Sequence, residues 1–138
     1  MKKLILILTI FALVGCVGGN AAVMKKELAN NAISADKGRI VVYRRDTHFY
    51  NSNIGFFIDG KMPGEIHNSS ILYFDVNEGE HQVSIDRKWG GENVIINVKK
   101  NGITYVKIYA SYRTGWTGVC NIEAIEPQIA INEIAELK

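Results

Sequence analysis

The chain has 138 residues, with 16 basic and 14 acidic residues and a formal net charge of +2 at pH 7. This length suits one modest domain with an adequate core. The nearly balanced charge excludes the strongly basic surface that binds nucleic acid, so no nucleic-acid partner is expected.

Residues 1–15 predict a signal peptide. Lys2 and Lys3 precede residues 4–14, an apolar stretch that only Thr9 interrupts. This stretch is shorter than the roughly 20 apolar residues of a membrane-spanning helix. A short apolar stretch behind a positive start is typical of secretory signals.

The end of this stretch, Leu13-Val14-Gly15-Cys16, resembles a bacterial lipobox. A lipobox implies that the thiol of Cys16 is alkylated with diacylglycerol and that the chain is cut just before it. We therefore expect lipidation at Cys16 and attachment to a membrane through this lipid. An ordinary signal peptide with an incidental cysteine and an uncleaved anchor are the alternatives. Val17 follows Cys16 where an aspartate would favour inner-membrane retention, so we expect the outer membrane, facing the periplasm.

Removal of residues 1–15 changes the charge and the cysteine count. It takes away two lysines and no acidic residue, which leaves 14 basic and 14 acidic residues. If Cys16 carries the lipid, Cys120 has no disulfide partner within the chain. An unpaired cysteine in an exported protein can be reactive or pair between molecules. Cys120 also fits a small buried hydrophobic residue in a strand, which we favour.

Residues 16–37 predict a lipidated tether. They show no strand pattern and are rich in Gly, Asn and Ala. We expect a flexible coil with at most one helical turn around residues 24–28. The folded domain is then expected to span residues 38–138.

Residues 38–138 predict a mainly β fold. Short β-branched and aromatic runs are separated by turns rich in Gly and Asn, and Asp59-Gly60 is a strong hairpin signal. The expected strands are residues 39–44, 54–58, 62–66, 71–76, 81–87, 94–98, 103–112 and 119–125. Their spacing favours an antiparallel β-sandwich or barrel.

The end of the chain predicts a short helix that packs on the sandwich or covers a sheet edge. Pro127 suits a first helical turn. Ala130, Ile131, Ile134 and Leu137 then form an apolar stripe.

The order of these strand and turn motifs is similar to that of the domain-of-unknown-function 2846 family of small bacterial envelope lipoproteins. The likeness covers about residues 38–137, and an early proline near Gly38 is missing. The resemblance implies a sandwich in the style of transthyretin-like and PEGA-type surface domains. The family has no established activity, so the resemblance supplies no catalytic residue. The matching runs are Gly38-Arg39-Ile40-Val41-Val42-Tyr43-Arg44, Ile58-Asp59-Gly60-Lys61, Gly64-Glu65-Ile66, Tyr73-Phe74-Asp75-Val76, Gly79-Glu80-His81-Gln82-Val83 and Asn101-Gly102-Ile103-Thr104-Tyr105.

The sequence shows no catalytic constellation and no metal-ligand spacing, so we expect neither catalysis nor a metal or other cofactor. His48 and His67 lie in polar contexts and are expected to be solvated. His81 starts a strand, where a turn or cross-strand hydrogen bond accounts for it. A small envelope enzyme that uses His81 with nearby carboxylates is an alternative.

Two predicted loops combine cations with aromatic side chains. One carries Arg44, Arg45 and Tyr50, and the other carries Arg113 and Trp116. Such residues dominate interface hot spots, so these loops are candidates for binding an envelope protein or a glycan. Ordinary loop packing, with Trp116 folded onto the core, is the alternative and is favoured. The sequence as a whole favours a non-enzymatic, lipid-anchored envelope domain for binding or structural support, and an inhibitor or accessory subunit that uses these loops is a further alternative.

Overall fold

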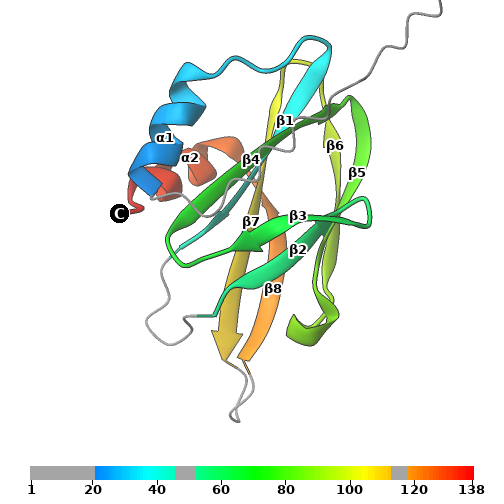
Figure 1. The fold of residues 1–138 in the computed structure, drawn as a ribbon, viewed down its shortest axis with the longest axis vertical. Coiled ribbons are helices and arrows are strands. Elements are labelled where there is room, and N and C mark those ends of the chain that lie inside the picture. The colour runs from blue at the N-terminus through cyan, green and yellow to red at the C-terminus, as the bar shows by residue number, and fades with distance from the viewer. Residues whose placement is uncertain (1–20, 46–51, 113–117) are drawn as a thin grey trace, which may run out of the picture.

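A computed structural model describes residues 21–45, 52–112 and 118–138. Within these residues the chain forms two four-stranded sheets, two α-helices and one 3-10 helix (Figure 1). The elements are α1 (Ala21–Asn30), β1 (Lys37–Arg44), β2 (Ile54–Ile58), β3 (Lys61–Ile66), β4 (Ser70–Asn77), β5 (Gly79–Ile85), η1 (Arg87–Trp89), β6 (Asn93–Val98), β7 (Ile103–Tyr112), β8 (Gly118–Ile125) and α2 (Pro127–Ala135). The predicted mainly β fold with a short C-terminal helix is confirmed.

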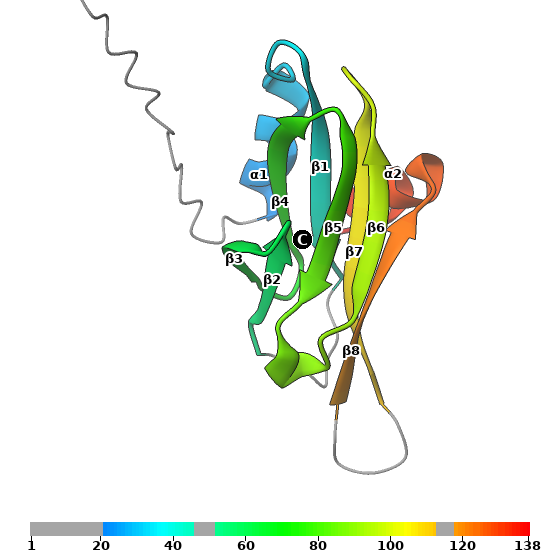
Figure 2. The ribbon, with the colours of Figure 1, turned by 90° about the vertical axis from the view of Figure 1, so that its right-hand side faces the viewer.

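We call the sheet with the order β4-β1-β7-β8 sheet A and the sheet with the order β3-β2-β5-β6 sheet B. The two sheets pack face to face as a sandwich, and both helices lie on the face of sheet A that is turned away from sheet B (Figures 1 and 2). Every strand pair within the described residues is antiparallel except β1 with β7, where Val41 pairs with Tyr105 in parallel. Between these two strands the chain passes to sheet B twice, first for β2 and β3 and then for β5 and β6, and it returns to sheet A as β4 and then as β7.

The core lies between the sheets and also beneath the helices. Residues of β5 alternate, with Val83 and Ile85 buried and Gln82 exposed. In contrast, all residues of β1 after Lys37 are buried. Sheet B covers one face of this strand and the helical layer covers the other, which explains its continuous apolar run.

The predicted hairpin at Asp59-Gly60 is confirmed. Ile58 pairs with Lys61, which leaves a two-residue loop. Both loop residues have positive φ angles, 51° at Asp59 and 78° at Gly60, as a type I′ turn requires. The turn therefore sets the pairing of Ile58 with Lys61, and the register of β2 and β3 shifts between Phe56 and Ile58.

The prediction of a flexible tether over residues 16–37 is wrong for the part that the structure describes. Residues 21–30 form α1, which packs against β4, and the folded domain therefore begins no later than Ala21 instead of at Gly38. Ala21 and Met24 are buried and Leu28 is half-buried, so the spacing of three and four residues makes an apolar stripe. The predicted helical turn at residues 24–28 lies inside this helix.

The C-terminal helix begins at Pro127 and packs on sheet A against β7, as predicted. Ala130, Ile134 and Leu137 are buried, whereas Ile131 is exposed beside α1. Among residues 21–45, 52–112 and 118–138, no helix combines the length and the apolar character needed to span a membrane.

Candidate functional site

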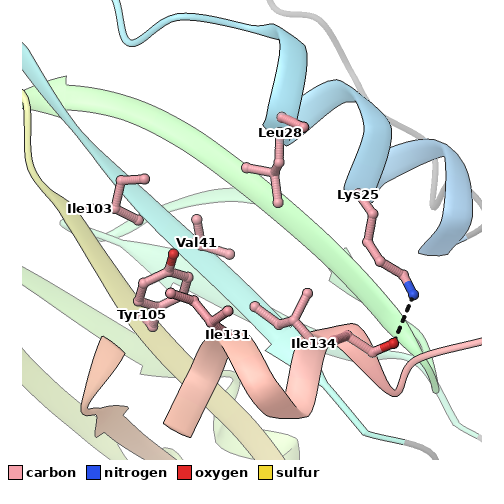
Figure 3. Close-up of a pocket in the computed structure, with 9 residues that line it drawn as sticks. Lys25, Leu28, Val41, Ile103, Tyr105, Ile131 and Ile134 are labelled. Atoms are coloured by element: carbon pink, nitrogen blue, oxygen red, sulfur yellow. Dashed lines mark hydrogen bonds between the residues drawn. The ribbon is translucent and has the colours of Figure 1, made fainter. Parts of the chain in front are cut away.

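An apolar groove of about 400 Å³ lies between the two helices on sheet A, and we call it the interhelical groove (Figure 3). Its walls come from α1 and α2, and its floor comes from β1 and β7. Its lining is predominantly apolar, and such hollows are the default candidates for ligand binding. The lining residues are Lys25, Leu28, Ala29, Val41, Ile103, Tyr105, Ile131, Ile134 and Ala135.

The parallel pair of strands builds the floor of the groove. Val41 of β1 lies opposite Tyr105 of β7 in the register, and both side chains face the helices (Figure 3). Burial raises the pKa of the Tyr105 hydroxyl, which therefore stays neutral at physiological pH. Leu28 of α1 lines one wall, and Ile131 and Ile134 of α2 line the other.

Lys25 joins the two helices at one end of the groove. Its ammonium group donates to the carbonyl oxygens of Leu137 at 2.6 Å and Ala135 at 3.3 Å. The last carbonyls of a helix have no partner within the helix and carry partial negative charge, so a lysine is favourable there. This contact fixes α1 relative to the end of α2.

Glu133 of α2 holds this helix against sheet A. Its carboxylate accepts hydrogen bonds from the Tyr43 hydroxyl at 2.9 Å and from the Lys107 ammonium at 3.0 Å. Burial opposes ionisation of Glu133, but these two partners outweigh it and lower the pKa of the carboxyl below its ordinary value. Burial and the same carboxylate raise the pKa of Tyr43. A charged Glu133 therefore fixes α2 on sheet A.

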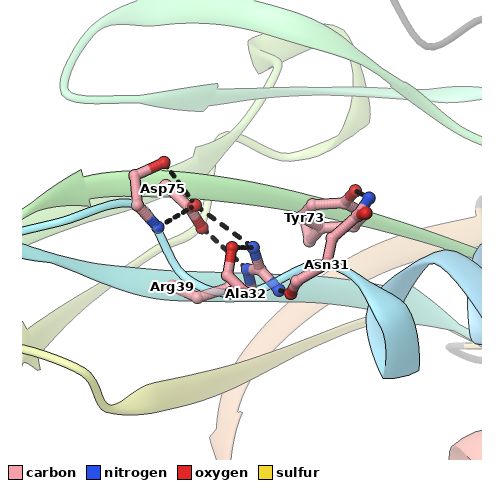
Figure 4. A network of polar contacts seen from close by, with 6 residues as sticks. Asn31, Ala32, Arg39, Tyr73 and Asp75 are labelled. Atoms are coloured by element: carbon pink, nitrogen blue, oxygen red, sulfur yellow. Dashed lines mark hydrogen bonds and ion pairs between the residues drawn. The ribbon is translucent and has the colours of Figure 1, made fainter.

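A buried arginine holds the end of α1 against the sheet (Figure 4). The Arg39 guanidinium donates to both carboxylate oxygens of Asp75, at 2.7 and 3.1 Å. It also donates to the carbonyl oxygens of Asn31 and Ala32, which follow α1, and lies 4.5 Å from the ring centre of Tyr73.

Asp75 is anchored from a second direction as well. The backbone N–H and the hydroxyl of Ser34 both donate to its carboxylate at 2.9 Å. Burial of Asp75 opposes ionisation, but the bonds from Arg39 and Ser34 lower its pKa below the ordinary value. The connection from α1 to β1 is therefore fixed by charge-assisted hydrogen bonds, which set the position of the α1 wall.

The residues predicted to contact a partner do not form one surface in the described part of the chain. Arg44 is fully buried, and its guanidinium donates to the carbonyl oxygen of Ser52 at 2.6 Å, so its predicted role as an exposed contact is wrong. Arg45 is exposed and pairs with Glu136 at 2.9 Å. Tyr50, Arg113, Trp116 and the predicted lipidation site Cys16 lie outside the described residues.

Cys120 is fully buried in β8, as predicted. Burial raises the pKa of its thiol above the ordinary value. A thiol is a poor nucleophile when it is buried and protonated. This cysteine therefore acts as a small core residue.

The imidazole of His81 is engaged at both nitrogens, as the prediction of a turn or cross-strand hydrogen bond requires. Nδ1 lies 2.5 Å from a carboxylate oxygen of Asp59, and Nε2 lies 2.6 Å from the carbonyl oxygen of Asn77. Both partners accept hydrogen bonds, so the arrangement favours a doubly protonated ring. Burial opposes this charge, but Asp59 and Asn77 outweigh it and raise the pKa of His81. A ring held in this way joins the β2–β3 turn to the β4–β5 turn.

Of the remaining two histidines, the structure describes only His67. His67 is half-buried and its Nδ1 contacts the side-chain oxygen of Asn53, while His48 lies outside the described residues. Within the described residues, no three His, Cys, Asp or Glu side chains are grouped so that they could hold a metal ion.

Comparison with known proteins adds no relative from which a role could be transferred. No protein-family model matches the chain, and no curated protein matches it significantly. The resemblance to the lipoprotein family named above therefore stays a prediction. The interhelical groove was not predicted, because its lining comes from four separate elements.

Proposed function

We propose that this protein is a lipid-anchored, non-enzymatic binding domain of a bacterial envelope, with the interhelical groove as its binding surface. Cys16 carries the lipid and places the domain at the outer membrane, on the periplasmic side. The groove takes up an apolar group of a partner. The observation that carries this proposal is the apolar hollow between α1 and α2, which lies near the start of the described chain and hence near the lipidated residue.

The chemistry of the groove supports binding over catalysis. Its lining is almost entirely hydrocarbon, the Tyr105 hydroxyl is neutral, and Lys25 is occupied with the end of α2. Apart from that hydroxyl, the floor of the groove supplies no acid, base or nucleophile. It supplies the apolar contact that holds a ligand without changing it.

The polar contacts around the groove support a preformed site. Lys25, Glu133 and Arg39 fix the helices to each other and to sheet A through charge-assisted hydrogen bonds. A site that is already formed loses less conformational entropy when a ligand binds. The groove therefore suits binding with little rearrangement of the backbone.

The anchor is tested by cell fractionation. The wild-type chain is expected in the membrane fraction, and Cys16→Ser is expected to release the domain or leave it with an uncleaved signal. Equal membrane attachment and equal processing of both proteins would overturn the anchor.

The binding surface is tested by photo-cross-linking in intact cells. A photoreactive residue at Ile131, in the groove, is compared with one at Ile95, which is also exposed but lies on sheet B. The groove position is expected to give a discrete cross-linked product that the sheet B position lacks. Identical products at both positions would count against the groove.

A further inference from the structure

The exposed large hydrophobic side chains are unevenly distributed over the described residues. Four of the six, Val23, Ile103, Ile129 and Ile131, belong to the helices or to the groove between them. The remaining two, Met62 and Ile95, lie on sheet B. We call the α1, α2 and groove surface the helical face. Ile103 and Ile131 line the groove together with the half-buried Leu28, and a contiguous exposed apolar surface marks an interaction site with a protein or a membrane.

The length of chain before α1 favours a membrane. Cys16 and Ala21 are five residues apart, and a fully extended chain of that length spans at most about 18 Å. Ala21 is buried against the domain, so α1 cannot swing free of the sheet. A lipid on Cys16 therefore keeps the helical face within a short distance of the bilayer.

A tether of this length also lowers the affinity that docking requires. Linking a second contact to an existing one replaces a bimolecular encounter by an intramolecular encounter, at an effective concentration in the millimolar range for short linkers. A few exposed aliphatic side chains then suffice to hold the domain on the surface, although they would not recruit it from solution.

The charges on the helical face do not favour an ionic partner. Lys25 is bound to the carbonyl oxygens at the end of α2, and Glu133 is neutralised by Lys107. Lys26 is exposed on α1, and Glu27 is the next residue of the same helix. Docking is therefore expected to depend on hydrocarbon contact and to resist salt.

We propose that the helical face docks on the bilayer that holds the lipid anchor, with Val23 and Ile131 at the boundary between headgroups and acyl chains. The interhelical groove then opens toward lipid, and a lipid acyl chain is the apolar group that it takes up. This inference rests on the lipid anchor of the proposed function.

The test uses the full-length protein purified from membranes and reconstituted into vesicles of phosphatidylethanolamine and phosphatidylglycerol. An environment-sensitive fluorophore is attached to Val23→Cys or Ile131→Cys on the helical face, and to Met62→Cys or Ile95→Cys as matched controls on sheet B. All four positions are exposed, whereas the native Cys120 is buried and resists labelling.

Labels at residues 23 and 131 are expected to emit at shorter wavelength and to be quenched several-fold more by lipids with brominated acyl chains than labels at residues 62 and 95. The difference is expected to persist from 0.1 to 1 M salt. Equal quenching at all four positions, or a difference that salt abolishes, would overturn the docking. The intact mass of the same preparation separates the two proposals. If Cys16 is lipidated but all four labels report an aqueous environment, only the docking is refuted. If Cys16 is unmodified, both the anchor and the docking are refuted.

Discussion

The ammonium group of Lys25 lies 2.6 Å from the carbonyl oxygen of Leu137, which joins the first helix of the described chain to its last residues. This contact spans 112 positions of the sequence. It closes one end of the interhelical groove and turns two short helices into one layer over sheet A. The groove thus depends on a polar contact at its rim as well as on apolar packing at its floor.

Replacing Lys25 with methionine is expected to lower the free energy of unfolding by about 1–2 kcal/mol, because a partly buried charged hydrogen bond is lost while the aliphatic chain is largely kept. The exposed neighbour Lys26 provides the control, and Lys26→Met is expected to change stability by less than about 0.5 kcal/mol. Urea unfolding of both variants measures the difference. Equal effects would show that the Lys25 contact does not join the helices.

Asp75→Asn is expected to destabilise the protein by about 3 kcal/mol, because it leaves the Arg39 guanidinium buried without its counter-charge. Asp36→Asn is the control. It removes the exposed pair with Lys100 and should cost no more than about 0.5 kcal/mol. Similar unfolding midpoints for the two variants would contradict a structural role for the buried pair.

The pH dependence of stability is expected to carry the signature of His81. The folded-state pKa of His81 is raised, so its contribution is complete below the ordinary pKa of 6.5 and is lost as the pH rises through the folded-state value. The stability difference between the wild type and His81→Gln should therefore be largest near pH 5.5 and shrink toward pH 9. Denaturant titrations at several pH values measure it, and a difference that stays constant or grows with pH would refute the charged His81 bridge.

The start of β1 is expected to tolerate no side chain at Gly38. A Cβ atom there would lie 2.3 Å from Cγ1 of Val98 and 2.4 Å from the backbone carbonyl oxygen of Lys99. Gly38→Ala should therefore destabilise the protein by about 2 kcal/mol or more. Gly64→Ala is the control, because its Cβ would meet only Leu72 at an ordinary 3.9 Å. Thermal unfolding of both variants checks this, and a Gly38→Ala protein as stable as the control would contradict the close approach of β1 and β6.

Cys120 is expected to be inert in the folded protein, because its thiol is fully buried and its pKa is raised. A thiol reagent should react with it at the rate of unfolding and at once in concentrated guanidinium chloride. Reaction within seconds under native conditions would contradict its place in the core.

The sequence predicts the strands well, because β-branched residues and Asp-Gly or Asn-Gly turns act over a few residues. It does not predict that β1 and β7 pair in parallel. These strands are about 60 positions apart in the sequence, and the chain passes between the sheets four times on the way from one to the other. Helix α1 is missed because Ala21, Met24 and Leu28 form a narrow stripe among alanines and lysines. Such a stripe gains its stability from packing on sheet A.

The candidate site is harder to predict than the fold. A charged residue at the end of a strand suggests exposure, yet Arg44 is buried because backbone carbonyl oxygens of Ser52 and Ile66 accept its hydrogen bonds. Arg39 is likewise buried in an apolar strand, because the Asp75 carboxylate and the backbone carbonyl oxygens of Asn31 and Ala32 accept its hydrogen bonds. The groove itself exists only once both helices lie on sheet A, so no local sequence pattern predicts it.

The lipid anchor is tested by the intact mass of the protein extracted from membranes. The expected chain begins at Cys16 and carries a diacylglyceryl group on the thiol. A chain that retains residues 1–15, or one that begins elsewhere with an unmodified Cys16, would contradict the lipid anchor and the placement of the groove at the membrane.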